Sequence, residues 1–470
     1  MPILTFNYDG IDIDLLYAPL DVPYIPEKFD IKDDKYLIGC DPETIRSLNG
    51  CRVASKILSL VPNIENYRTT LRFFKMWANV RGVYSNVMGY PGGVAWAILV
   101  AFICQLYPTA EPVKLIERFF RVYSAWKWPA SVNITHRVVN PAIGERVWDP
   151  MYSSDLMPVI TPAYPCMNST YNISRPTKRV ILSEFQRGLQ LTKPLEKCGL
   201  PPEEVMEILK KLSEPTDFFL RYNNYLDIVI TAGTNAELDR WFGWVESKVR
   251  LLVKSIDALN DNENDPPIKL HPHPISFKEP APATEGEEEA KSDAEKRPPP
   301  RHFYIGIDTR TLEAQIKANS DQPRALNIGD QIEEWINMLY TKMTDRSPTM
   351  EVTVNSVRAY DLPEFVFPDE RRPEKKKKKK KDKQKTEGDE AKQEQGSVQE
   401  QVESREGPIT QDSKRVKLDE SGEATNDPTT SEPTPQTPSA QQEKCSPSSI
   451  QDQASLPELG EKRKEPVNSV

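Results

Sequence analysis

The position of the last aromatic residue, Phe367, most limits what this chain can fold into. All 17 Tyr, 15 Phe and 8 Trp residues of the 470-residue chain precede residue 368. Residues 371–470 are rich in Lys, Glu, Gln, Ser and Pro, and they cannot bury enough apolar area to offset the entropy of ordering them. We therefore predict a disordered tail at 371–470 and expect folded structure in the first 370 residues.

Charge is distributed unevenly along the chain. The formal net charge is −9, but residues 371–385 ("RRPEKKKKKKKDKQK") carry a net +9. A nucleic-acid partner would have to be held by local basic patches, because the body of the chain is acidic. The basic run and the clusters "SKRVKLDE" (413–420) and "EKRKEP" (461–466) either contact RNA nonspecifically or act as nuclear import signals. Three clusters in one tail favour import, and so an import receptor as a partner.

Several classes of protein are disfavoured by the remaining composition. No two of the six cysteines form a Cys-x-x-Cys pair, which disfavours a zinc ribbon and suits a reducing compartment. The start "MPILTFNYDG" has no signal-peptide pattern. The longest apolar run, Val94–Cys104, is too short to span a bilayer and predicts a buried helix. His271-Pro-His273 is interpreted as a loop rather than a metal site.

The stretch "FNYDGIDIDLLYA" (6–18) predicts a β-hairpin. Asp9-Gly10 suits a two-residue turn between alternating apolar and polar residues, which pairs Tyr8 with Ile11 and Thr5 with Asp14. Alternation then places Phe6, Tyr8, Ile11, Ile13 and Leu15 on one face and Thr5, Asn7, Asp12 and Asp14 on the other. From pattern alone, this hairpin is half-buried with a solvated polar face.

Helical and strand patterns follow in order along the chain. We expect a short helix near 42–49, strong helices over 64–125, irregular Pro-rich structure at 126–175 and helices again at 176–212. A strand-like segment at 217–232, a helix, a strand at 302–308, a helix around "QIEEWINMLY" and a strand "MEVTVNSV" predict a small α+β domain. Residues 278–301 are Pro/Glu/Ala-rich and predict a disordered insertion.

Two stretches of the helical part are candidates for chemistry. On a helix, Arg72, Lys75 and Asn79 share one side, opposite the apolar residues Phe73, Phe74, Met76, Trp77 and Val80. The simplest interpretation of that side is a solvated polar face. "YPGGVAW" (90–96) opens an apolar helix with two glycines, where backbone can approach a phosphate or a base edge closely. A tight turn between packed helices explains the same pattern.

Longer stretches resemble one known family. "IRSLNGCRV", "LRFFKMWANVRGVYSNVMGYPGGVAWAILVAFICQLYP", "VWDP", "LMPVITPAYPCMNSTYNIS" and "WFGWVESKVRLLV" resemble the eukaryotic nuclear poly(A) polymerases, in that family's order and spacing, over about residues 1–370. The resemblance implies an α+β multidomain protein. Its parts are a partial nucleotidyltransferase (polymerase-beta-like) sheet at 1–60, a helical central domain at 61–200 and an RNA-binding, RNA-recognition-motif-like domain at 201–370, followed by the tail.

The implied reaction adds AMP from ATP to the 3′ end of pre-mRNA in the nucleus, with pyrophosphate as the product. The family uses two Mg²⁺ or Mn²⁺ ions held by three aspartates, because such ions help form the attacking alkoxide and offset charge on the leaving group. RNA, ATP and 3′-end processing factors are the implied partners, and no membrane is involved. Uridylyl transfer is a weaker alternative, because the nucleotide pocket resembles the adenylyl enzymes.

The resemblance also implies individual site residues. Asp14 matches the family's third metal-binding aspartate, whereas Asp12 matches a variable neighbour. The implied ATP contacts are Asn49 (ribose), Lys75 and Tyr84 (triphosphate), Asn86 nearby, and Gly93 and Val94 (adenine). The implied RNA contacts are Asn172 and Arg250. Thr5 departs from the family, which often has lysine in this strand.

The family's Gly-Ser motif and first two aspartates would lie before Met1, so we expect a chain that lacks the N-terminal part of the catalytic domain. One carboxylate cannot bridge two ions. An alternative function is therefore a catalytically inactive RNA-binding form or a competitor of the polymerase, and we expect the printed chain by itself to be nearly inactive. Because the rest of its sheet is not in this sequence, we also expect residues 1–60 to be poorly ordered.

Overall fold

The computed structural model describes residues 3–367, except 26, 138, 145–146, 198, 261–265, 281–296 and 319–326. The expected tail at 371–470, most of the expected insertion at 278–301, Cys198 and Cys445 therefore lie outside the described residues. Cys40, Cys51 and Cys104 are free thiols. No helix among the described segments is long and apolar enough to cross a membrane.

The chain begins with the predicted hairpin, formed by β1 (Ile3–Tyr8) and β2 (Ile11–Leu16). Asp9 and Gly10 adopt φ values of 51° and 76°, as a two-residue turn of this kind requires. The predicted register is confirmed, with Tyr8 opposite Ile11 and Thr5 opposite Asp14. The predicted half-burial is wrong, because apolar side chains of the hairpin are largely exposed (Phe6 43%, Tyr8 70%, Ile11 64%, Leu15 56%).

A long helix, α1 (Pro42–Leu60), follows the short 3₁₀ helix η1 (Asp34–Leu37). The Asp41 side chain accepts from the N–H groups of Glu43 and Thr44, and Pro42 occupies the first helical position, so the start is well defined. The prediction of a short helix near 42–49 gave the start correctly but not the length. The helix continues because Val53 and Ile57 are buried in the main hydrophobic core.

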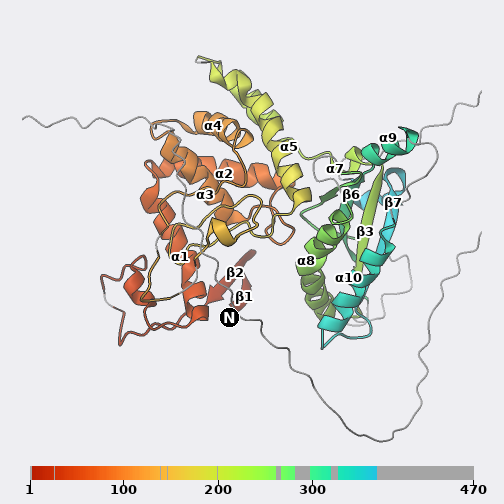
Figure 1. Cartoon of the computed structure of the whole chain (residues 1–470), viewed down its shortest axis with the longest axis horizontal. Helices are drawn as coiled ribbons and strands as arrows, with labels where there is room; N and C mark the ends of the chain where they lie inside the picture. Colours follow the sequence, from red (N-terminus) through yellow and green to blue (C-terminus); the bar gives the residue numbers. More distant parts are fainter. Residues whose placement is uncertain are drawn as a thin grey trace, which may run out of the picture. The chain divides into compact units, whose positions relative to one another are not determined.

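The helical part is built from α2 (Ile64–Val80), α3 (Gly93–Leu106), α4 (Pro112–Ser124) and α5 (Arg175–Thr192) (Figure 1). As predicted, the apolar run Val94–Cys104 is a helix that is mostly buried. An aromatic cluster fills the space between the helices; its members are Phe74, Trp77, Trp96, Phe119, Phe120 and Phe185. Gly188 of α5 lies against Phe120, where a β-carbon would come within 2.2 Å of the ring.

Residues 126–175 are mainly irregular, as predicted, with one 3₁₀ turn, η2 (Pro150–Tyr152). After α5 come η3 (Lys193–Glu196) and α6 (Pro202–Leu212). One detail of the predicted faces of α2 is wrong. Phe74 and Trp77 are buried, but Met76 is 43% exposed although it was placed on the apolar side.

The C-terminal part contains an antiparallel sheet of order β4-β6-β3-β7, with β5 also paired to β6. The strands are β3 (Asn224–Thr231), β4 (Lys269–Pro272), β5 (Phe277–Lys278), β6 (Arg301–Asp308) and β7 (Glu351–Arg358). The helices are α7 (Phe218–Arg221), α8 (Asn235–Asp257), α9 (Arg310–Ala318) and α10 (Gly329–Lys342). The predicted strand at 217–232 therefore starts as a short helix. His271 lies in β4, so the loop predicted for His271-Pro-His273 is wrong.

Both faces of this sheet are covered. Helices α8 and α10 pack on one face, where Leu226, Ile228 and Ile230 of β3 join Trp241 and Leu339 in the main core (Figure 1). The alternate residues of β3 point to the other face. There α7 and the final 3₁₀ turns, η4 (Ala359–Asp361) and η5 (Glu364–Val366), form a second cluster, whose members are Phe218, Phe219, Tyr225, Tyr304, Leu362 and Val366.

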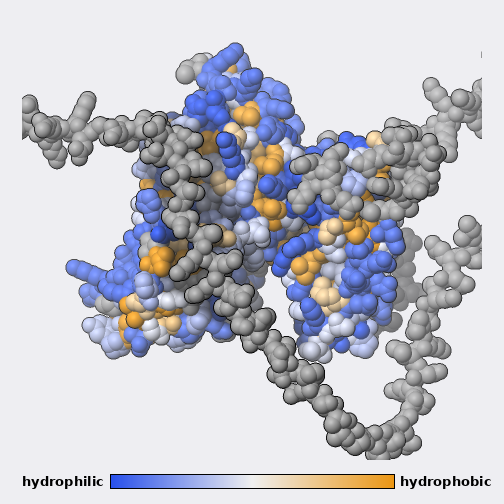
Figure 2. Space-filling view, in the orientation of Figure 1, coloured by the Kyte–Doolittle hydropathy of each residue, from blue (hydrophilic) through white to orange (hydrophobic). Residues whose placement is uncertain are grey.

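On the face shown in Figure 2, hydrophilic residues predominate and hydrophobic residues appear as separate patches. Large exposed apolar residues gather on the β1–β2 hairpin, where they include Ile3, Leu4, Tyr8, Ile11 and Leu15.

Candidate nucleotide and RNA site

The turn that joins α2 to α3 carries two of the predicted nucleotide contacts, Tyr84 and Asn86, and the first two residues of α3, Gly93 and Val94, are two more. The Tyr90 N–H donates to the Ser85 carbonyl at 2.8 Å, and the Gly89 N–H donates to the Asn86 carbonyl at 3.2 Å. Gly89 has a φ of +88°, and a β-carbon there would lie 2.9 Å from the Asn172 carbonyl oxygen. Both the backbone conformation and the close approach therefore require glycine at this position.

Tyr84 and Gly93 lie against each other at the start of α3. A β-carbon on Gly93 would be 2.9 Å from the Tyr84 hydroxyl, so glycine leaves the space that the hydroxyl occupies. Gly92 precedes the helix and provides no side-chain cap, and Val94 is 43% exposed. The predicted triphosphate contact and the predicted adenine contacts thus lie together, beside the N–H groups of a helix start.

Asn172 connects this turn to the segment predicted to contact RNA. Its side-chain N–H donates to the Asn86 carbonyl at 3.0 Å. The Oδ1 atoms of Asn86 and Asn172 are both buried and have no hydrogen-bond partner among the residues that the structure describes. Because an amide oxygen can accept two hydrogen bonds, both atoms have unused acceptor capacity in this structure.

Lys75 lies on α2 with an exposed side chain. Its backbone carbonyl accepts a hydrogen bond from the Asn79 side chain at 2.7 Å, so two residues of the predicted polar face of α2 contact each other. A compact, exposed ammonium group is suited to phosphate oxygens. This arrangement is compatible with the predicted triphosphate contact and also with a solvated face.

The other predicted residues lie on separate elements. Asn49 is half-buried on α1, and its Oδ1 is buried without a partner in the described part of the chain. Arg250 is half-buried on α8. An ionic cluster that no sequence pattern predicted joins α8 to α5. In it, the buried Asp257 of α8 accepts from Arg175 at 2.8 Å and Arg179 at 2.9 Å, both on α5. This cluster joins α8, which carries Arg250, to the start of α5, close in sequence to Asn172.

Asp14 is exposed on β2, opposite Thr5. A divalent cation needs several oxygen ligands. Within the described ranges, no three or more His, Cys, Asp or Glu side chains lie close enough together to hold a metal ion. The described residues therefore supply one candidate ligand, and by themselves they do not fit a complete two-ion site.

Comparison with known proteins gives consistent results along most of the chain. A poly(A) polymerase nucleotidyltransferase domain model matches residues 1–61, a poly(A) polymerase central domain model matches 66–207, and a poly(A) polymerase predicted RNA-binding domain model matches 217–376.

Relatives at substantial identity carry the same family name. The chain is 39% identical over 377 residues to nuclear poly(A) polymerase 1 of Arabidopsis thaliana, covering 79% of this chain and 48% of that protein. It is 44% identical over 282 residues to a poly(A) polymerase of Dictyostelium discoideum, covering 59% and 33%. The chain thus spans about half the length, or less, of these relatives. Three successive domain matches and these identities show that it belongs to the eukaryotic nuclear poly(A) polymerase family.

Proposed function

We propose that this protein is a template-independent polynucleotide adenylyltransferase that adds AMP from ATP to the 3′ ends of pre-mRNA. The contact between Asn172 and the turn that carries Asn86 supports this most directly. It brings a residue implied to contact RNA next to residues implied to contact the nucleotide, as transfer from one to the other requires.

The residues take complementary roles in this proposal. Lys75 and Tyr84 hold the triphosphate, and Asn49 holds the ribose. The backbone at Gly93 and the exposed side chain of Val94 contact adenine. Asn172 and Arg250 hold the RNA so that its 3′-hydroxyl faces the α-phosphate, which is attacked as pyrophosphate leaves.

Divalent ions, either Mg²⁺ or Mn²⁺, belong to the proposed reaction through the family. When bound, they would lower the cost of forming the attacking alkoxide and offset charge on pyrophosphate. Asp14 is the side chain proposed to contribute one ligand. The described residues by themselves do not complete the ion site.

We further propose that the protein acts in the nucleus with 3′-end processing factors. The Arabidopsis relatives are named nuclear poly(A) polymerases. The basic clusters at 371–385, 413–420 and 461–466 suit recognition by an import receptor. They lie outside the described residues, so this proposal rests on sequence.

Binding measurements on the full 470-residue chain test the proposed site. We expect Lys75→Met to weaken ATP binding, measured by calorimetry with Mg²⁺, by about tenfold or more, because a phosphate contact is lost. The matched control is Lys210→Met, which removes another exposed lysine, on α6. Equal ATP affinities for both variants and the wild type, or no ATP binding by the wild type, would contradict the assignment.

A second candidate function is RNA binding without nucleotidyl transfer, which would make the protein a competitor of active polymerases. The exposed, single Asp14 favours it. Incubation of the full chain with an oligo(A) primer and each of the four nucleotides separates the candidates. Incorporation of AMP that Asp14→Asn abolishes supports adenylyl transfer, preferential use of UTP would indicate uridylyl transfer, and oligo(A) binding without incorporation supports the second candidate.

A further inference from the structure

The beginning of the turn with the proposed nucleotide contacts is hydrogen-bonded to the C-terminal part of the chain. Arg81 Nη1 donates to the carbonyls of Glu214 at 2.7 Å and Pro215 at 2.9 Å, and the Thr216 N–H donates to the Val80 carbonyl at 3.1 Å. The Arg81 guanidinium is also paired with the buried Glu184 of α5. The chain is therefore firmly held where α2 ends.

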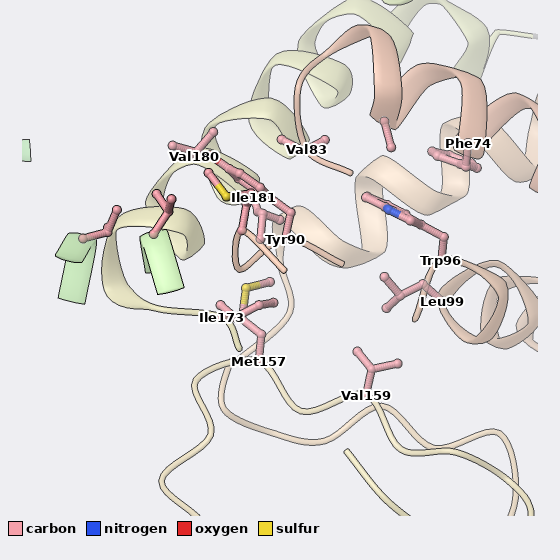
Figure 3. Close-up of a cluster of buried hydrophobic side chains, with 14 of the residues drawn as sticks. Phe74, Val83, Tyr90, Trp96, Leu99, Met157, Val159, Ile173, Val180 and Ile181 are labelled. Atoms are coloured by element: carbon pink, nitrogen blue, oxygen red, sulfur yellow. The ribbon is translucent and has the colours of Figure 1, made fainter. Parts of the chain in front are cut away.

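A second bond holds the far end of the same turn. The Tyr90 hydroxyl donates to the carbonyl of Pro272 at 2.7 Å. Pro272 is the last residue of β4 and lies opposite Ile305 of β6, so the acceptor belongs to the sheet. The Tyr90 side chain is fully buried. Figure 3 shows Tyr90 within a cluster of buried hydrophobic side chains that also contains Ile173 and Ile181.

We propose that Tyr90 is a positioning residue for the nucleotide, whose hydroxyl fixes the turn that carries the ATP contacts to the sheet of the RNA-binding part. Along the sequence, Tyr90 lies between Tyr84 and Asn86 on one side and Gly93 and Val94 on the other. The inference rests on the proposed function, because it assumes that this turn holds ATP. It adds a residue that the family resemblance did not point to.

The turn needs such an attachment because of its glycines. Gly89, Gly92 and Gly93 lack the β-carbons that restrict backbone conformation, and two of them are required by close contacts with Asn172 and Tyr84. A hydrogen bond to a carbonyl of an established strand is directional, and breaking it would leave the buried Pro272 oxygen unpaired. Burial also raises the pKa of Tyr90 well above its ordinary value, so the hydroxyl keeps the proton that it donates.

The variant Tyr90→Phe tests the inference, with Tyr123→Phe as a matched control. Tyr123 is also fully buried, and its hydroxyl donates to the Leu99 carbonyl at 2.8 Å, but that bond joins α4 to the middle of α3. Both variants lose one buried hydrogen bond and should lower the unfolding temperature similarly. We expect only Tyr90→Phe to raise the ATP dissociation constant of the full chain, by about threefold to tenfold.

Each outcome decides the matter. If both variants unfold at a lower temperature but bind ATP as tightly as the wild type, Tyr90 has a purely structural role and the inference is wrong. If both weaken ATP binding equally, the effect is a general loss of stability and the inference is also wrong. If the wild type binds no ATP, the proposed function fails and this inference fails with it.

Discussion

The β1–β2 hairpin and the α2–α4 helices contain the same kinds of large apolar side chains, but most of those of the hairpin are exposed and most of those of the helices are buried. Phe6 is 43% exposed and Phe74 is fully buried. The helices pack on one another and on α5, whereas the two strands of the hairpin pair only with each other. Burial therefore depends on whether a second layer is present, and the identity of the residue does not decide it.

The comparison has an energetic consequence. Ring contacts such as Phe74 with Phe119, whose centroids are 3.8 Å apart, contribute to stability only when both rings are held in place. The hairpin is held by its ladder and by the Asp9-Gly10 turn. Two-stranded hairpins are marginally stable in water. We therefore expect mutations in the two regions to have very different effects.

The largest expected difference comes from a matched pair of truncations. Phe74→Ala leaves a cavity in the aromatic cluster and should reduce the free energy of unfolding of the helical part by about 3–5 kcal/mol. Phe6→Ala removes a side chain that is 43% exposed and lies outside the packed core, and it should cost less than about 1 kcal/mol. Urea unfolding of the full-length variants, followed by tryptophan fluorescence, measures both effects.

Limited proteolysis of the wild type provides an independent check on this pair. Segments with few buried contacts open at low free energy, so cleavage should begin within residues 3–38 before it reaches 64–192. Equal protection of the two regions would contradict the comparison. So would an unfolding cost for Phe6→Ala close to that for Phe74→Ala.

Local patterns in the sequence predicted the elements of both regions well. The Asp9-Gly10 dipeptide and strict alternation were enough to place Thr5 opposite Asp14, because a two-residue turn fixes the register of a hairpin. The helical period likewise placed Phe74 and Trp77 in the core. These properties depend on neighbours within a few residues.

What the sequence did not show depends on residues far apart in the chain. Alternation alone implies a covered face, so the exposure of Phe6 was missed. The Asn172–Asn86 bond joins residues 86 positions apart, and the Tyr90–Pro272 bond spans 182 positions. Single hydrogen bonds from a side chain to a distant carbonyl leave no periodic signal, so contacts of this kind become visible only in the structure.

Acid should destabilise the C-terminal sheet, which is packed like the helices, by an intermediate amount. Burial lowers the pKa of His273 to about 4 and that of His271 well below its ordinary value. As the pH falls below about 6.5, the unfolded chain binds protons that the folded chain excludes, so stability that is fully present above this pH is lost as it approaches 4. For His273 the loss is roughly 3 kcal/mol, from a pKa difference of about 2.5.

Urea unfolding at several pH values between about 7 and 4.5 measures this loss. His273→Gln should flatten the dependence of stability on pH, whatever its effect at neutral pH. His136 is exposed in the irregular segment, so His136→Gln is the control and should leave the slope unchanged. An unchanged slope for His273→Gln would show that this histidine titrates normally in the folded state.

The smallest expected effect comes from adding one cross-strand charge pair to the hairpin, which stabilises it without adding a second layer. Thr5→Lys places an ammonium group directly opposite Asp14 and introduces the residue that the family often has in this strand. A cross-strand pair of opposite charges contributes about 0.2–1 kcal/mol, and salt screens it because both positions are exposed. Amide hydrogen exchange of β1 and β2 should slow at low salt and return towards wild type at high salt. Thr5→Met controls for side-chain length, and equal protection by Met and Lys would show that the charge of Asp14 has no part in the effect.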